Sequence, residues 1–434
     1  MKILLIGSGA REHALARKIM ESSSTVSLLC YGSSINPGIA PLVSHYIPGE
    51  MSDIMGMVQC AQNHEVDMVV VGPEAPLASG IADELHKHGI ACIGPSSDLA
   101  QIETSKAFGR DFVQAIAAQY VPRYRQFQAQ DPQALEFLES LGQDFVLKAD
   151  GLCGGKGVKI SGEQLHSHQQ ALDDPICQEP FVIEEKCTGV EFSLISFCDG
   201  AHAKHMPIIH DHKRLLDDDQ GPNTGGMGTI SDHDHHLPFI DPDMIQQAQA
   251  LNELVMKSLS EKCAKPYCGF LYGGFMQSTK GLKLIEYNAR LGDPEGINLL
   301  ALLETDIVAI FEAMIAGRLD QQEVVFKTQA SVCKYIVPSS YPGALDCDPL
   351  MDISAIERPE RLYFGSIDMQ GDQLRMKGSR AIAVLATGDT LCEAALRAEE
   401  TCELVQGSVY YRKDIGSESL LQKRAETLIT KVTT

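Results

Sequence analysis

One segment of this 434-residue chain carries the strongest signal in its sequence: Phe145-Val-Leu-Lys-Ala-Asp-Gly-Leu-Cys-Gly-Gly-Lys-Gly-Val158. An apolar strand delivers a lysine, and a glycine-rich loop with a second lysine precedes the next strand. Glycines let backbone N–H groups approach phosphate oxygens, and lysines supply positive charge. No Gly-Lys-Ser/Thr opens a helix here, and a mobile hairpin with solvated lysines is the alternative. The pattern favours phosphate binding by Lys148, Gly151, Gly154, Gly155, Lys156 and Gly157.

A second signal lies further along, in Leu282-Lys-Leu-Ile-Glu-Tyr-Asn-Ala-Arg-Leu-Gly-Asp-Pro-Glu295. Glu286 and Asn288 are two residues apart on an apolar strand, so their side chains point to the same face. Oxygen ligands side by side suit magnesium, which completes its octahedron with phosphate and water. Arg290 shares that spacing and can meet a phosphoryl group. A satisfied polar pair at a strand end is the alternative, but the abrupt change to Glu-x-Asn-x-Arg favours a metal site.

A third pattern lies between these two, in Phe181-Val-Ile-Glu-Glu-Lys-Cys-Thr-Gly-Val-Glu-Phe-Ser193. A strand ending in acids is followed by a short connector and then by Gly-x-Glu. Such a connector can read the edge of an adenine with its backbone, and a carboxylate can accept hydrogen bonds from ribose hydroxyls. Acids at strand ends are commonly just solvated, so this pattern is informative only beside the other two.

The first hundred residues alternate between strand and helix patterns. The spacing of Ile54, Met57, Val58 and Ala61 is that of one helix face. Alternation of this kind predicts a doubly wound parallel sheet, whose ligands lie beyond the carboxyl ends of its strands. The expected strands are apolar runs at Ile3–Ile6, Val26–Cys30, Val66–Val71 and Ile90–Ile93.

A glycine pattern at the first strand end invites a dinucleotide interpretation, which the sequence does not sustain. In Gly7-x-Gly9 the third glycine of the fingerprint falls at Glu12, and the second strand lacks the acid that would hold a ribose. A tight turn explains the glycines. It leaves Arg11 and Glu12 at a helix start, where an anion can bind.

Length and patterning predict three domains. A doubly wound α/β domain is expected at 1–103. A second domain is expected at 104–325. An α+β, strand-rich domain is expected at 326–434. Within these, we expect a helix at about 105–118, glycine- and charge-containing strands from 145 to 295, and one apolar helix at 297–315.

Composition excludes several classes of partner. Lys plus Arg number 36 against 58 Asp plus Glu, which gives a net charge of −22. A chain this acidic is a poor candidate for binding nucleic acid or an anionic membrane. The apolar run at the N-terminus is too short for a secretory signal, and no run is long enough to cross a bilayer. Thirteen cysteines without a C-x-x-C pair predict reduced thiols and a cytoplasmic location.

The three patterns, in this order, resemble the ATP-grasp superfamily, in which two lobes clamp ATP and acid and amide ligands hold Mg²⁺ or Mn²⁺. The resemblance implies that the domain at 104–325 is a two-lobed α+β ATP-grasp domain with a mobile lobe at about 120–188. It also implies that Lys106 and Lys148 bind the phosphates and that Gly151–Gly157 form a mobile lid. It also implies that the hinge, with Glu184, Glu185 and Cys187, contacts adenine. Ribose would fall to Glu191, and the metals to Glu286 and Asn288.

Further motifs narrow the resemblance to the phosphoribosylamine–glycine ligase family. They are Ile6-Gly-Ser-Gly-Ala-Arg-Glu-His-Ala14, Val71-Gly-Pro-Glu-Ala-Pro-Leu77, Asp211-His-Lys-Arg214, Gly221-Pro-Asn-Thr-Gly-Gly-Met-Gly228, Arg290–Glu295 and Arg412-Lys-Asp-Ile-Gly416. Membership implies that glycine is joined to 5-phosphoribosylamine through glycyl phosphate at the expense of ATP, in purine biosynthesis. The implied catalytic residues are Arg290, Lys213 and Lys148. The implied substrate-binding residues are Gly9, Arg11, Glu12, Pro73, Glu74, Asp211, Lys213, Arg214, Asn223, Thr224, Gly225, Gly226, Met227, Asp293, Pro294 and Glu295.

The chain departs from the family pattern at 34–38, 296–297, 338–343 and 378–380, on the amine and ribose-phosphate side. A ligase acting on a different amine is therefore one alternative, and a catalytically silent nucleotide-binding protein is another. The run Asp232-His-Asp-His-His236 can suggest a transition-metal site, but turn residues flank it and favour a solvated loop. We expect small-molecule substrates and a monomer or weak homodimer.

Overall fold

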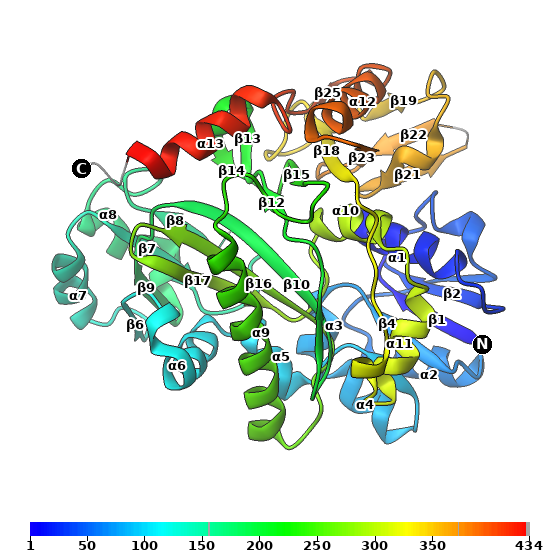
Figure 1. Ribbon diagram of the computed structural model, residues 1–434, viewed down its shortest axis with the longest axis horizontal. Helices are drawn as coiled ribbons and strands as arrows, with labels where there is room; N and C mark the ends of the chain where they lie inside the picture. The colour runs from blue at the N-terminus through cyan, green and yellow to red at the C-terminus, as the bar shows by residue number, and fades with distance from the viewer. Residues whose placement is uncertain (155–156, 372, 431–434) are drawn as a thin grey trace.

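The computed structural model describes the backbone of residues 1–154, 157–371 and 373–430, with side chains up to Glu426. Figure 1 shows the N-terminal sheet and the C-terminal strands on one side of the molecule and a small lobe on the other. Between them lies the central sheet. Among the described residues, the protein has no helix with the length and hydrophobicity required to cross a bilayer.

The N-terminal domain is a doubly wound parallel sheet, as predicted. Its strand order is β3-β2-β1-β4-β5, so the order reverses between β1 and β4. The edge strand β3 is missing from the prediction because none of its residues is buried and they form no apolar run. The strands are β1 (Lys2–Ile6), β2 (Ser27–Gly32), β3 (His45–Pro48), β4 (Met68–Val71) and β5 (Ala91–Ile93). The helices are α1 (Ala10–Met20), α2 (Ile54–Asn63), α3 (Glu74–Ala78), α4 (Ile81–Lys87) and α5 (Ser97–Thr104).

Helix α6 (Lys106–Ala117) leads from this domain into the rest of the chain, close to the predicted 105–118. The Ser105 side chain caps it by accepting a hydrogen bond from the Phe108 N–H. Lys106 is therefore the first residue of a helix that begins directly at the central sheet.

The small lobe is an antiparallel sheet, β6-β9-β7-β8, packed on two helices. It has a hydrophobic cluster of its own, in which the Phe127 and Phe181 rings stack with centroids 5.4 Å apart. The other hydrophobic cluster found among the described residues is one large core in the rest of the protein. The lobe elements are β6 (Tyr124–Phe127), α7 (Gln133–Leu141), β7 (Phe145–Ala149), β8 (Val158–Ile160), α8 (His168–Leu172) and β9 (Phe181–Glu185).

The central sheet has the order β11-β10-β16-β17 and is antiparallel. The expectation of strands throughout 145–295 is wrong, because the long helix α9 (Pro242–Cys263) packs against this sheet. Its buried residues, which include Leu251, Val255 and Leu259, follow the helical period. The strands are β10 (Val190–Asp199), β11 (Ala203–His205), β16 (Cys268–Ser278) and β17 (Gly281–Asn288).

The single helix expected at 297–315 is two helices, α10 (Glu295–Leu302) and α11 (Ile307–Ile315). Asp306 ends the connection between them, where its carboxylate accepts a hydrogen bond from the Val308 N–H and caps α11. The sequence did not reveal this break, because both helices bury apolar residues and the apolar pattern runs on from one to the other.

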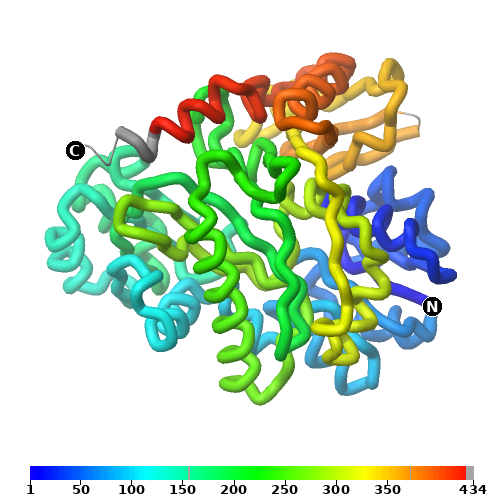
Figure 2. Tube along the Cα trace, in the orientation of Figure 1, coloured from blue at the N-terminus to red at the C-terminus, as the bar shows by residue number. Residues whose placement is uncertain are grey.

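The C-terminal sheet combines distant parts of the chain. Its order is β12-β15-β18-β23-β20, with β25 paired to β18. Figure 2 shows the green trace of residues 210–231 beside the yellow trace of β18. These strands are β12 (His210–Asp211), β15 (Gly228–Ser231), β18 (Ala330–Pro338), β20 (Leu362–Phe364), β23 (Ile382–Gly388) and β25 (Val409–Tyr410).

Smaller elements complete the C-terminal part. A second sheet has the order β21-β22-β19-β24, and the hairpin β13-β14 projects from the segment between β12 and β15. These elements are β13 (Arg214–Leu216), β14 (Gln220–Asn223), β19 (Leu350–Asp352), β21 (Ile367–Gln370), β22 (Gln373–Met376), α12 (Leu391–Glu403), β24 (Gln406–Gly407) and α13 (Glu418–Thr430).

Arg412 fixes the β13-β14 hairpin to the tail. Its guanidinium is fully buried and pairs with Asp414 at 2.7 Å and with Asp219 at 3.0 Å, and it also donates to the Arg214 carbonyl at 3.1 Å. Two carboxylates compensate the buried charge of Arg412. If the arginine were removed, both carboxylates would lose this partner, and the protein would be destabilised.

We therefore expect Arg412→Met to lower the free energy of unfolding by about 3 kcal/mol, because two carboxylates lose their buried partner. Thermal unfolding followed by circular dichroism measures this. Arg358→Met, at an exposed position, is the matched control and should leave the melting temperature unchanged. Equal melting temperatures for the two variants would contradict this account of Arg412.

Candidate active site

A cleft of about 700 Å³ lies where the small lobe, the central sheet and the two end domains meet. Its lining includes most of the site residues predicted from the three sequence patterns and from the family resemblance. These are Arg11, Glu74, Lys106, Lys148, Gly151, Gly154, Gly157, Glu184, Glu185, Cys187, Glu191, Asp211, Lys213, Arg214, Asn223, Thr224, Gly225, Glu286, Asn288, Arg290, Asp293 and Glu295.

A β-bulge in β17 turns the predicted metal ligands toward the cleft. The register shifts so that Leu284 pairs with Phe275 and Glu286 with Gly274, which leaves Ile285 as the extra residue. Under strict alternation Glu286 and Asn288 would share the face of Leu284, which is buried in the core. The bulge places them on the other face instead.

The carbonyl group freed at the bulge anchors two cations. The Ile285 oxygen accepts hydrogen bonds from Arg110 at 2.7 Å and from Lys148 at 3.2 Å. Because α6 carries Arg110 and β7 carries Lys148, one backbone group joins a helix, the small lobe and the central sheet. The bulge therefore shapes the cleft floor as well as its ligands.

Glu184 completes this arrangement as a buried anion. Its carboxylate pairs with Arg110 at 2.6 and 2.7 Å and with Lys148 at 2.8 Å. Burial alone would raise the pKa of Glu184, but the two neighbouring cations lower it to about 2. The Glu184 side chain is thus committed to these cations, so only its backbone remains to contact a ligand at the hinge.

Glu286 and Asn288 form an oxygen-donor pair that fits a hard divalent cation. Burial would raise the pKa of Glu286, but Lys106, with its Nζ 3.5 Å from the carboxylate, and further cations lower it to about 2. The carboxylate is therefore ionised at neutral pH, beside an amide oxygen donor. This is the donor chemistry that Mg²⁺ prefers.

Arg290 lies at the N-terminal side of the cleft between two carboxylates. Its guanidinium is 3.2 Å from Glu103 and 3.5 Å from Glu74, and its buried Nε has no hydrogen-bond partner among the described residues. Burial opposes the charge, yet the carboxylates, Glu103 first, raise the pKa of Arg290. The side chain is therefore held as a cation, with its Nε facing the Glu74 carboxylate at 3.5 Å.

A second group of charged and polar residues forms another wall of the cleft, and its members Glu295 and Tyr272 lie near Arg290. Lys213 pairs with Glu191 at 2.8 Å. Asp211 has a buried oxygen without a partner among the described residues, and burial together with nearby Glu295 raises its pKa. The Tyr272 hydroxyl donates to Glu295 at 3.0 Å. This wall offers both a cation and unpaired acceptors to polar substrates.

The tail of the chain closes this wall through Arg380. Its guanidinium donates to the Asp293 carbonyl at 3.0 Å and to the Gly226 carbonyl at 3.2 Å, and lies 4.5 Å above the Tyr335 ring. Tyr335 in turn donates to the Asp293 carboxylate at 2.6 Å. The predicted glycine loop is thus held from the C-terminal sheet.

Six predicted residues do not line the cleft: Gly9, Glu12, Pro73, Gly226, Met227 and Pro294. Glu12 acts behind it, since its carboxylate caps α1 by accepting from the Gly9 N–H at 2.7 Å and binds the Arg11 guanidinium at 2.6 Å. The Met227 side chain is completely buried in the core. Gly155 and Lys156 lie outside the described residues.

Arg214 reaches across the cleft instead of into it. Its guanidinium pairs with Glu163, which follows β8 of the small lobe, and donates to the Gly221 carbonyl at 2.9 Å. This pair links the β13-β14 hairpin to the small lobe.

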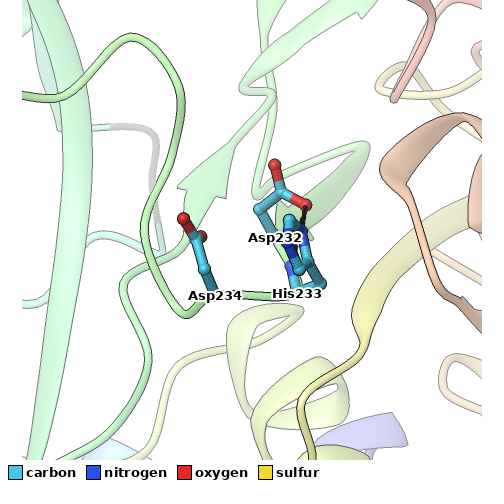
Figure 3. A group of neighbouring side chains, drawn as sticks. All are labelled: Asp232, His233 and Asp234. Carbon is cyan, nitrogen blue, oxygen red and sulfur yellow. Dashed lines mark hydrogen bonds and ion pairs between the residues drawn. The ribbon is translucent and has the colours of Figure 1, made fainter.

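The aspartate and histidine residues at 232–236 do not line the cleft. Figure 3 shows Asp232, His233 and Asp234 close together on a loop, where the His233 Nδ1 lies 3.0 Å from the Asp232 carboxylate. His233 and Asp234 are exposed to solvent. These contacts agree with the solvated loop favoured by the sequence.

Sequence reasoning missed several cleft residues, which are Glu103, His210, Tyr272, Arg380 and Arg424. Four of them lie outside every motif that the sequence analysis singled out. Arg380 lies in the segment 378–380, which the sequence marked only as a departure from the family pattern. Arg424, on α13, had the weakest signal, because only the fold brings that helix to the cleft. His210 directly precedes the motif that begins at Asp211, and this proximity is a signal that could have found it.

The Glu184 carboxylate yields a test of the buried charge cluster. Its pKa is lowered in the folded protein, so its stabilising effect is complete above about pH 4.5 and is lost as pH falls toward about 2. Glu184→Gln should cost about 3 kcal/mol at pH 7 by leaving two buried cations unpaired. In denaturant unfolding, the stability gap to wild type should stay constant above about pH 4.5 and narrow as pH falls from there toward about 2. Glu185→Gln, next along the strand and more exposed, serves as control, and a pH-independent gap would refute the assignment.

Comparisons with known proteins agree along the whole chain. Models of the phosphoribosylglycinamide synthetase family match its N domain at residues 1–103, its ATP-grasp (A) domain at 104–296 and its C domain at 331–418. The chain is 40% identical over 432 residues to phosphoribosylamine–glycine ligase of Methanocella arvoryzae, and 39% identical over 437 residues to that of Methanobrevibacter smithii. Both alignments cover 98% of each chain.

Solved structures show the same architecture. Phosphoribosylamine–glycine ligase from Thermotoga maritima superposes with a TM-score of 0.80 at 25% identity, covering 96% of this chain and 100% of that one. A biotin carboxylase from Campylobacter jejuni shares the fold, with a TM-score of 0.70 at 14% identity over 97% and 95% of the two chains. The predicted combination of a doubly wound domain, an ATP-grasp domain and a strand-rich C-terminal domain is confirmed, and the chain belongs to the phosphoribosylglycinamide synthetase family.

Proposed function

We propose that this protein joins glycine to 5-phosphoribosylamine, giving glycinamide ribonucleotide, ADP and phosphate. Family membership over the full length supports this activity. The observation that carries it in the structure is the position of Glu286 and Asn288 on the cleft side of β17, beside Lys106 and Lys148. A binding-only protein has no need of ionised metal ligands next to a set of phosphate-binding cations.

In this proposal the triphosphate lies between the small lobe and the central sheet. Lys106 and Lys148 neutralise phosphate oxygens, and the backbone N–H groups at Gly151, Gly154 and Gly157 approach them. The hinge that follows β9, with Glu185 and Cys187, contacts the adenine. The ribose lies toward Glu191.

Glu286 and Asn288 would hold a divalent cation, Mg²⁺ or Mn²⁺. When bound, the metal ion neutralises phosphate charge and orients the terminal phosphoryl group. The choice between these metals and the number of ions belong to the proposal.

The reaction needs two displacements. A glycine carboxylate oxygen attacks the γ-phosphorus of ATP, and the bond to the β-phosphate oxygen breaks, giving glycyl phosphate and ADP. The amine nitrogen of phosphoribosylamine then attacks the glycyl carbon, loses a proton, and phosphate leaves with the bonding electrons. Phosphorylation supplies the leaving group that a carboxylate lacks.

The protein contributes positioning and charge neutralisation to both steps. Arg290 is held as a cation by Glu74 and Glu103 in the lining of the cleft, where its charge can neutralise the transferring phosphoryl group. Lys213 and Lys148 flank the same space. Water would hydrolyse an acyl phosphate, so closure of the small lobe matters. The pair between Arg214 and Glu163 holds that lobe against the β13-β14 hairpin.

Glu286→Gln should reduce kcat by about 10²- to 10³-fold, because a ligand to charge-neutralising metal is weakened where the phosphoryl group transfers. Coupled measurement of ADP formation provides the rate, and circular dichroism checks the fold. The matched control is Glu312→Gln, an exposed carboxylate on α11 far along the chain from the cleft residues. Near-normal turnover in Glu286→Gln would remove this residue from the mechanism.

A second experiment separates the proposed ligase from its alternatives. With ATP, glycine and hydroxylamine, the enzyme should form glycine hydroxamate, because the acyl phosphate is trapped. ADP release with glycine should rise at least about tenfold when freshly made phosphoribosylamine is added and remain low with a panel of other amines. A different preferred amine would point to a diverged ligase, and absence of both hydroxamate and ADP would leave a nucleotide-binding protein.

A further inference from the structure

Among the buried polar atoms that lack a hydrogen-bond partner, those of His210 and Arg424 lie in parts of the cleft that the proposed mechanism has not used. Within the described residues, buried side-chain nitrogen or oxygen atoms without a hydrogen-bond partner occur at His13, Ser96, His210, Asp211, Arg290 and Arg424. The last four line the cleft. A buried polar atom without a partner costs about 1–3 kcal/mol, so such atoms indicate where a ligand completes the site.

His210 presents a hydrogen-bond acceptor to the cleft. Its ring is only 3% exposed, and its Nδ1 lies 2.7 Å from the Glu191 carbonyl oxygen. A carbonyl accepts, so Nδ1 carries the proton and Nε2 keeps its lone pair. Burial, reinforced by the nearby Arg424 charge, lowers the pKa of His210 to about 4, and the ring is neutral at pH 7. The flanking groups from other elements are His212, Asp219 and Glu191.

Arg424 presents a donor at the same end of the cleft. It belongs to α13, which Figure 1 shows running from the C-terminal strands toward the small lobe. One terminal nitrogen is 2.5 Å from the Asp219 carboxylate, while the buried Nε–H has no partner. The family's C-domain model ends at residue 418, where α13 begins.

The charges around these two atoms select the kind of group that fits. Asp219 balances the Arg424 charge, and the other cations of this region, Arg214 and Lys213, are paired with Glu163 and Glu191. A phosphate would face these acids and the His210 lone pair. A hydroxyl pair suits them better, because each hydroxyl donates one hydrogen bond and accepts others.

We propose that His210 and Arg424 bind the vicinal ribose hydroxyls of the nucleotide, so that the C-terminal helix α13 forms part of the nucleotide site. This inference rests on the proposed function, since it takes ATP as the ligand. His210 Nε2 accepts from one hydroxyl, and Arg424 Nε–H donates to a hydroxyl oxygen. Both are specificity-determining residues, which distinguish a ribonucleotide from its deoxy forms and take no part in phosphoryl transfer.

The test compares ADP with 2′,3′-dideoxy-ADP by titration calorimetry in the presence of Mg²⁺. The wild-type protein should bind ADP at least about tenfold more tightly, as expected for buried hydrogen bonds. His210→Leu should reduce this ratio to about twofold or less by weakening ADP alone. His210→Gln, whose amide oxygen can replace Nε2 as acceptor, should restore most of the ratio. If His210 served only to fill space, the His210→Gln variant would not restore the affinity ratio.

Arg424→Met should also lower the ratio, by about fivefold, through loss of one donor. Lys423→Met removes the adjacent cation of α13, whose Nζ lies 3.4 Å from Asp218 and outside the cleft lining, and it should keep the wild-type ratio. A wild-type ratio in both His210→Leu and Arg424→Met would overturn the inference. So would equal weakening of both nucleotides.

Different results would reject the proposed ligase reaction and the proposed roles of His210 and Arg424. Normal glycine-dependent ADP formation with an unchanged hydroxyl ratio would reject only the roles of His210 and Arg424. Tight ADP binding with the expected ratio, but no ligase activity with any amine, would reject only the proposed reaction.

Discussion

The cleft depends on one buried charge cluster, in which Glu184 holds Arg110 and Lys148 against the Ile285 carbonyl. These residues come from β9, α6, β7 and β17, so the cluster joins the small lobe to the central sheet at the point where phosphates are expected. Taking three charges out of water is costly, and only close pairing with further hydrogen bonds compensates. The pairing distances of 2.6 to 2.8 Å meet that condition. Lys148 is thereby held in place before any nucleotide arrives.

The protein as a whole is strongly acidic, yet its cleft gathers cations. Lys106, Lys148, Lys213, Arg290 and Arg380 all line it, each near at least one carboxylate. This balance lets the cations remain charged although they are largely removed from water. An incoming triphosphate then exchanges partners within an existing network, and the reorganisation needed on binding is small.

Much of the fold was predictable, because periodicity and strand-end glycines are local properties. Four of the N-terminal strands and helix α6 were located within a few residues. The failures have physical causes: β3 has no buried residue and lacks an apolar run, and α10 and α11 share a continuous apolar surface across their break. For the site, the two-residue spacing of Glu286 and Asn288 on a strand predicted that they share a face. It could not reveal the bulge at Ile285 that turns this face to the cleft. Arg424 and Glu103 reach it only through tertiary packing, which leaves no local trace.

The sheet shared by β12, β15 and β18 constrains how this protein can change over evolution. Strands from the middle of the chain occupy its edge, so severing the chain ahead of β18 would strip hydrogen-bonding partners from both fragments and expose unpaired backbone. The small lobe has its own apolar cluster and no such shared strands. Replacement of the whole segment by recombination is therefore easier to accommodate in the small lobe than in the C-terminal sheet. Lineage-specific insertions should accumulate in that lobe first.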